Sequence, residues 1–288
     1  MSKDVHVDES AVHKMPRVQD VMESEDSYRE FYERVGGEYP ETEVVHKGDP
    51  RRYNVILSEL LPLAAKGYRL LDIGCNDGVY TIPYSRAGGI GHGIDISSSL
   101  IQKARAQAEG LSATFEVADI EKYTSKTQYD AVLMSEVLEH LRNPEIAMVR
   151  ALKALRRGGF LLLSCPTPYG LITTKRYIME LFQNRKLTEK GIVRTEETIL
   201  GERYHMAGFH YRHDGYYPPM LRRWLHGLGL RTIRSYTAVH GRSSLFLRTL
   251  QRLETTVRIE RMPVLNLFGE TNVLLMAKTH EAVTSASQ

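Results

Sequence analysis

Five short apolar segments alternate with stretches that have helical features, and this alternation constrains the fold more than any other property of the chain. The apolar segments cover residues 68–73, 91–95, 113–117, 129–135 and 160–164. Gly74 stops the first segment and Pro166 the fifth, as is typical of buried strands. Helices are predicted over residues 49–61, 79–87, 97–108 and 143–159. The alternation predicts an α/β fold with a doubly wound, Rossmann-like sheet of parallel strands.

Five regions are expected along the chain. Residues 1–48 form an acidic N-terminal arm with a short helix, and residues 49–165 form a ligand-binding core. Residues 166–216 interrupt the alternation, so we expect a lid or substrate-binding insertion after the fifth strand. Residues 217–280 complete the sheet with an antiparallel last strand, and residues 281–288 are a disordered tail.

Charge is distributed unevenly over the 288 residues, although the net charge is only +3. Residues 1–50 hold 6 Lys and Arg against 13 Asp and Glu, whereas residues 171–262 hold 17 against 8. The basic second half indicates an anionic substrate, a membrane surface or nucleic acid, or else an ordinary solvated surface.

The sequence favours a cytoplasmic protein. Its best apolar run, residues 264–277, is interrupted by Gly269 to Asn272 and is shorter than the roughly 18 residues of a spanning helix. The N-terminus lacks the apolar region of a secretory signal. Two cysteines, Cys75 and Cys165, are too few for a disulfide scaffold.

A loop of small residues follows the first predicted strand. Asp72, Gly74, Asn76 and Gly78 occupy alternate positions there, which allows a tight turn and a close approach to a ligand. The G-x-G-x-x-G spacing of a nicotinamide or flavin site is absent.

Polar residues also end the next three strands. Asp95 is placed to accept hydrogen bonds from ribose hydroxyls. Asp119, next to the apolar Ile120, is placed to accept one from an exocyclic amine. The fourth strand ends at Ser135 and Glu136. Together, the four strand ends predict a cofactor that contains adenosine and lacks a pyrophosphate.

On these residues the chain resembles the class I S-adenosylmethionine-dependent methyltransferases, over residues 52–166 and more loosely to 278. Their first loop usually reads D/E-x-G-x-G-x-G, and Asn76 replaces the middle glycine here. Asn is the residue other than glycine that best tolerates a positive φ. The resemblance implies an S-adenosyl-L-methionine site. In it, the methionine is held by Asp72, Gly74, Asn76 and Gly78, and the ribose by Asp95 and Ile96. The adenine is held by Asp119 and Ile120, and Ser135 lies beside these residues.

A Glu-x-x-Glu-His cluster follows the fourth strand. If a helical turn begins there, Glu136, Glu139 and His140 share one face. The trio could hold a divalent cation, or His140 could act as a general base whose ring a carboxylate orients. Either arrangement favours transfer to a hydroxyl, which must lose a proton.

The cluster is similar to one in the ubiquinone-pathway O-methyltransferases and the small-RNA 2′-O-methyltransferases. That resemblance implies metal-assisted O-methylation with Mg²⁺ or Mn²⁺. In the RNA enzymes a downstream histidine completes the site, and the candidates here are His205, His210 and His213. We favour His210, which gives a predicted catalytic and metal set of Glu136, Glu139, His140 and His210.

Three acceptor classes remain open. The first is a hydroxyl of a sugar-containing or other small biosynthetic intermediate, anionic in keeping with the basic second half. The second is RNA, contacted by basic and aromatic residues, namely Arg212, Arg222, Arg223, Arg231, Arg234, Tyr216, Tyr217 and Trp224. The third is a non-catalytic or membrane-associated relative, in which residues 244–258 meet a partner or lipid. No oligomeric state is predicted.

Overall fold

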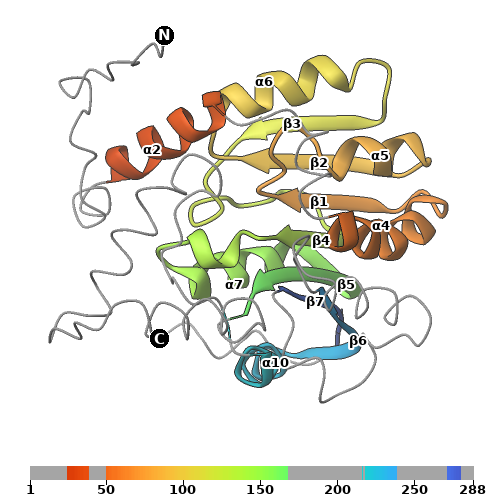
Figure 1. The fold of residues 1–288 in the computed structure, drawn as a ribbon. Coiled ribbons are helices and arrows are strands. Elements are labelled where there is room, and N and C mark those ends of the chain that lie inside the picture. Colours follow the sequence, from red (N-terminus) through yellow and green to blue (C-terminus); the bar gives the residue numbers. More distant parts are fainter. Residues whose placement is uncertain (1–24, 39–49, 168–215, 217, 239–270, 280–288) are drawn as a thin grey trace, which may run out of the picture.

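The protein is built around one seven-stranded sheet. A computed structural model describes residues 25–38, 50–167, 216, 218–238 and 271–279, and its strands run in the order β3-β2-β1-β4-β5-β7-β6 (Figure 1). The strands are β1 (Arg69–Ile73), β2 (Ile90–Asp95), β3 (Ala113–Val117), β4 (Tyr129–Ser135), β5 (Leu155–Pro166), β6 (Leu230–Ala238) and β7 (Thr271–Lys278). The first five pair in parallel, and β7 lies antiparallel between β5 and β6. The predicted parallel sheet with an antiparallel last strand is confirmed.

Helices cover both faces of the sheet. They are α2 (Glu25–Glu38), α4 (Pro50–Ala64), α5 (Thr81–Arg86), α6 (Ser98–Gln107), the 3₁₀ turn η2 (Leu138–His140), α7 (Pro144–Ala154) and α10 (Pro218–Gly227). Two apolar clusters hold α4, α5 and α6 on one face, and a third holds α7 and α10 on the other. Successive β1 residues show the division, since Leu70 belongs to a cluster on the first face and Leu71 to the cluster on the second. The sheet is therefore doubly wound.

The strand order reverses at β1, which has β2 on one side and β4 on the other. In parallel sheets of this kind, ligands bind outside the carboxyl ends of the strands at such a switch point. The polar residues predicted to hold the cofactor follow β1, β2, β3 and β4, and so they all lie at this one edge.

The boundary between α7 and β5 differs from the prediction. The sequence indicates a helix up to Gly158 and Gly159, whereas α7 ends at Ala154 and β5 begins at Leu155. Leu155 is fully buried and pairs with Tyr129, and the ladder then shifts register before the main run of pairs. Packing of Leu155 therefore overrides its helical periodicity.

Helix α2 lies within residues 1–48, where the sequence predicts a short helix. It lies beside α6 at the end of the sheet where β1 and β2 terminate (Figure 1). The predicted lid lies outside the described residues apart from 166, 167 and 216, and so do residues 244–258 and the tail. Among the described helices, none is long and apolar enough to cross a membrane.

Candidate active site

The loop after β1 takes a left-handed backbone conformation at three positions. The φ angles are 69° at Gly74, 54° at Asn76 and 92° at Gly78. The asparagine that replaces a glycine of the usual motif thus occupies a conformation that few other side chains accept. A Cβ added at Gly74 would lie 2.5 Å from Cγ2 of Val137, which follows β4. The missing side chain lets the β1 loop and the β4 end approach closely.

Asp95 joins this loop to the end of β2. Its carboxylate accepts hydrogen bonds from the backbone N–H groups of Asn76 at 2.9 Å and Ser97 at 3.0 Å. Burial raises the pKa of Asp95, and the backbone bonds oppose the rise by stabilising the anion. A carboxylate has about four acceptor sites, so Asp95 retains the capacity to accept from a ribose hydroxyl.

Asp72 is buried behind the loop. The Thr81 hydroxyl, at the start of α5, donates to Asp72 at 2.7 Å, and burial raises the pKa of Asp72 to about 7. The residue thus joins β1 to α5.

Asp119 lies half-buried after β3. It accepts a hydrogen bond from the Glu121 N–H at 2.9 Å, and the Arg142 guanidinium is 3.8 Å away. Ile120 is buried within the core cluster, whereas Ile96 is half-buried after β2. The carboxylate thus stays at the crevice while Ile120 contributes packing.

The Glu-x-x-Glu-His cluster does not form the helical turn assumed from its spacing. Glu136 has a φ of 55°, and the 3₁₀ turn begins only at Leu138. The Glu136 side chain forms an ion pair with Arg52 at 2.9 Å and accepts a hydrogen bond from the Ser164 hydroxyl at 3.1 Å. Ser135 also contacts the Ser164 hydroxyl, at 3.1 Å. The left-handed backbone of Glu136 thus accompanies a side chain that is paired with Arg52 of α4.

Glu139 is fully buried, and neither of its carboxyl oxygens has a hydrogen-bond partner among the described residues. Burial and the nearby charge of Glu136 raise the pKa of Glu139 well above its ordinary value. Nε2 of His140 lies 3.9 Å from Oε1 of Glu139. The imidazole is 15% exposed.

The described part of the chain contains no group of three or more His, Cys, Asp or Glu side chains arranged to hold a metal ion. Glu136 contacts Arg52 and Ser164 instead. Among the described residues, Glu136, Glu139 and His140 are thus not arranged as a divalent-cation site. His205, His210 and His213 lie outside the described residues.

Three contributors were missed in the sequence. Arg52 lies in the first turn of α4, and nothing in its sequence context marks it as a partner of a strand end. Glu121 accepts hydrogen bonds from the N–H groups of Arg142 and Asn143 and fixes the turn before α7. Helix α2 was predicted without contacts, and it supplies Tyr28, Tyr32 and Glu33 next to the strand ends. Contacts between segments so far apart leave no periodic signal.

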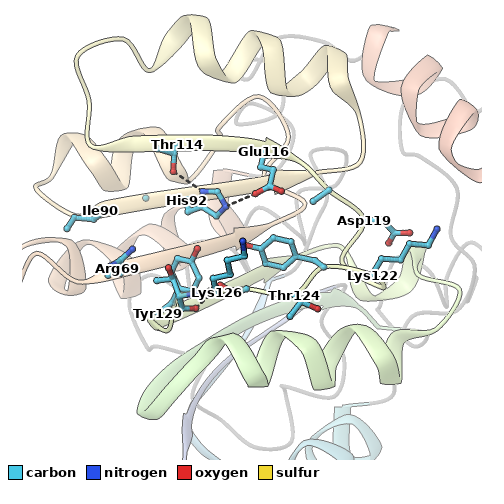
Figure 2. A pocket seen from close by; sticks show the side chains of 15 residues that line it. Arg69, Ile90, His92, Thr114, Glu116, Asp119, Lys122, Thr124, Lys126 and Tyr129 are labelled. Atoms are coloured by element: carbon cyan, nitrogen blue, oxygen red, sulfur yellow. Dashed lines mark hydrogen bonds and ion pairs between the residues drawn. The ribbon is translucent and has the colours of Figure 1, made fainter.

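A cavity of about 680 Å³ lies on the sheet face beneath the β3–β4 connection and reaches the predicted site only at Asp119. Figure 2 shows His92 at its floor, bonded to Thr114 at 2.8 Å and 3.6 Å from Glu116. Arg69, Lys122 and Lys126 also line it. This cavity is separate from the crevice at the strand ends.

The strand order, the left-handed glycine loop and the carboxylate after β2 together define the class I methyltransferase fold. The methyltransferase domain family matches residues 45–235, well over half of the chain. The chain belongs to this family, and the predicted class of S-adenosylmethionine-dependent methyltransferase is confirmed.

Relatives and solved structures agree with this assignment. The chain is 34% identical over 100 residues to a ubiquinone biosynthesis O-methyltransferase of Bradyrhizobium sp. (strain ORS 278). The aligned residues make up 34% of this chain and 40% of that protein. The protein of the same name from Citrobacter koseri is 25% identical over 183 residues, 58% of this chain and 74% of that one. The chain spans about half the length of the first curated relatives or less.

The fold also resembles magnesium protoporphyrin IX methyltransferase of Synechocystis PCC 6803, whose crystal structure contains bound S-adenosylhomocysteine. The TM-score is 0.52 at 20% identity, over 91% of this chain and 98% of that one. At this identity the match concerns the fold alone.

Proposed function

We propose that the chain transfers the methyl group of S-adenosyl-L-methionine to a hydroxyl of a small-molecule acceptor. The observation that carries the proposal is the hydrogen-bonded pairing of the left-handed β1 loop with Asp95 at the switch point of the sheet. Asp95 would hold the ribose, Asp119 the adenine amine, and the backbone around Gly74 the methionine. When bound, the sulfonium supplies an activated methyl group, so the protein has to orient the acceptor and accept one proton.

His140 is the residue we assign to the proton. It lies after β4, and its backbone is fixed because its carbonyl accepts the Tyr28 hydroxyl at 3.0 Å. A ring nitrogen would take the acceptor's hydroxyl proton while oxygen bonds to the methyl carbon. The buried Glu139 lies beside the imidazole, with its Oε1 3.9 Å from Nε2 of His140.

The alternative role for this cluster is a Mg²⁺ or Mn²⁺ site that includes His210. The ion pair between Glu136 and Arg52 supports the metal-free arrangement instead, because it occupies one of the proposed ligands. Activity should persist after dialysis against EDTA. Loss on chelation and recovery with either ion would support the metal site.

Two of the residues considered for RNA binding contact other parts of the protein, which favours a small acceptor over RNA. Arg234 contacts both oxygens of Glu59 at 2.8 and 2.9 Å, and Trp224 packs against the core cluster. Both side chains are therefore engaged within the fold. Relatives named ubiquinone biosynthesis O-methyltransferase support an acceptor that is a small biosynthetic intermediate, and the basic second half of the chain supports an anionic or sugar-containing one.

The test uses labelled S-adenosylmethionine with catechols, sugar nucleotides, phosphorylated sugars, lipids and RNA. We expect an O-methylated small molecule, and turnover that falls more than about 100-fold in His140→Gln. His226→Gln, an exposed histidine on α10, is the matched control. Label in RNA alone, or full activity of His140→Gln, would overturn the proposal.

A further inference from the structure

Helix α2 is bonded to the start of α6, immediately after the proposed ribose carboxylate. The Glu33 carboxylate accepts hydrogen bonds from the backbone N–H groups of Ser98 at 2.6 Å and Ser99 at 3.2 Å, and from the Ser98 hydroxyl. Negative charge at the first turn of a helix is stabilising because these N–H groups have no partner within the helix. We call this contact the α2 clasp.

The other contact of α2 lies at the end of β4. The Tyr28 hydroxyl donates to the His140 carbonyl at 3.0 Å, and the Arg142 guanidinium lies 4.6 Å from the centre of the Tyr28 ring. Tyr28 is only 4% exposed. Helix α2 therefore runs from the β4 end to the β2 end, across the switch point where the cofactor is proposed to bind.

Tyr32 lies between these two contacts, one helical turn from Tyr28. Its ring meets the His140 ring edge-on, with the centroids 6.1 Å apart. Burial raises the pKa of Tyr32 well above its ordinary value, and the carboxyls of Glu139 and Asp95 contribute to the rise. The side chain is thus within electrostatic reach of both strand ends.

We propose that α2 is a wall of the cofactor site, in which Tyr32 contacts the bound nucleoside and the α2 clasp controls how fast the nucleoside leaves. The inference rests on the proposed function, since it assigns the crevice to S-adenosylmethionine. It adds a binding residue, Tyr32, and an element, α2, that the strand ends alone do not provide. Release then requires α2 to separate from α6.

Two adjacent glycines near the end of α2 allow a matched test. A Cβ at Gly36 would lie 2.2 Å from Oγ and 2.9 Å from Cβ of Ser97, whereas a Cβ at Gly37 meets nothing within 4 Å. Both changes to alanine favour the helix itself, because alanine has the higher helix propensity. Only Gly36→Ala should prevent α2 from docking on α6.

The experiment measures S-adenosylhomocysteine dissociation from the full-length chain by stopped flow. We expect Gly36→Ala to release it at least about fivefold faster than wild type, and Gly37→Ala to stay within about twofold. Glu33→Gln should also accelerate release, with the exposed Glu30→Gln on the same helix as its control. This second pair decides the question if Gly36→Ala does not fold.

The contact of Tyr32 is tested by affinity. Tyr32→Ala should weaken S-adenosylhomocysteine binding about fivefold or more, and Tyr32→Phe, which keeps the ring, should restore it to within about twofold. Provided that wild type binds S-adenosylhomocysteine, either of two results would overturn the inference. One is an unchanged dissociation rate in both Gly36→Ala and Glu33→Gln, and the other is an equal change in their control variants. A wild-type chain that does not bind would instead overturn the proposed function as well.

Discussion

The Arg52 guanidinium lies 2.9 Å from the Glu136 carboxylate, so an ion pair joins α4 to a left-handed residue at the end of β4. The side chains are 18% and 22% exposed, which leaves the pair only partly screened by water. A φ of 55° is costly for glutamate and persists only where other contacts hold the residue. We therefore regard this pair as part of what orients the start of the Glu-x-x-Glu-His segment.

A double-mutant cycle tests that relationship. Arg52→Gln and Glu136→Gln should each lower the free energy of unfolding, and the double variant should lose less than the sum, with a coupling of about 1 kcal/mol. Urea unfolding measures all four proteins. Arg52→Gln combined with Asp130→Asn, whose carboxylate pairs instead with Arg156, should show no coupling. A coupling near zero for the first pair would mean that the ion pair has no role.

Gly74→Ala tests the close approach of the β1 loop to the β4 end. The φ is 69° at Gly74 and 76° at Gly110, so alanine pays a similar backbone cost, roughly 1 kcal/mol, at both. Only at Gly74 does the new Cβ meet a neighbour, Val137, whereas nothing lies within 4 Å at Gly110. We expect Gly74→Ala to be the less stable variant in thermal unfolding and to bind S-adenosylhomocysteine more than about tenfold more weakly. Equal behaviour of the two variants would argue against the packed loop.

The stability of the fold should decrease with pH because of Asp72. Burial raises its pKa from 3.8 to about 7, so between these values the folded protein keeps a proton that the unfolded chain has lost. Stability from this group is complete below about pH 4, declines as the pH rises, and is lost above about pH 7. Asp72→Asn removes the titration and retains an oxygen that can accept from Thr81.

The measurement is urea unfolding of wild type and Asp72→Asn at pH 5 and pH 8. The free energy of unfolding of the variant, relative to that of wild type, should increase by about 2 kcal/mol from pH 5 to pH 8. Groups common to both proteins cancel in that difference. Glu109→Gln, at an exposed carboxylate after α6, should show no such gain. A difference between wild type and Asp72→Asn that does not change with pH contradicts the raised pKa.

Much of the sheet could be predicted from the sequence because buried parallel strands are short, apolar and separated by residues that stop or cap helices. Asp95 and the glycine loop were identifiable for the same reason, since strand ends that share an edge bring such residues together. Ile120 shows the limit of this argument, because an apolar residue after a strand is equally suited to the core. In the structure, Ile120 is almost fully buried there.

The cluster after β4 was harder to predict. Spacing alone suggested that Glu136, Glu139 and His140 share a helical face, yet Glu136 adopts a positive φ that no sequence period reveals. Its ion pair with Arg52 spans 84 residues of chain, and the contact of Tyr28 with His140 spans 112. Tertiary contacts of this separation determine which side chains face the crevice, and they have no local signature.

The central claim is that Asp95 at the end of β2 holds the ribose of an S-adenosyl nucleoside, and calorimetric titration with S-adenosylhomocysteine tests it most directly. Asp95→Asn removes the charge and retains one oxygen, which can accept from the backbone N–H of either Asn76 or Ser97 but not both, because these groups bond to different carboxylate oxygens. We expect this variant to bind more than about tenfold more weakly than wild type, because a bond between the anion and a hydroxyl contributes about 1.5–3 kcal/mol. Glu116→Gln, on the neighbouring strand in the separate cavity, should bind within about twofold of wild type. A folded Asp95→Asn variant with unchanged affinity would contradict the account.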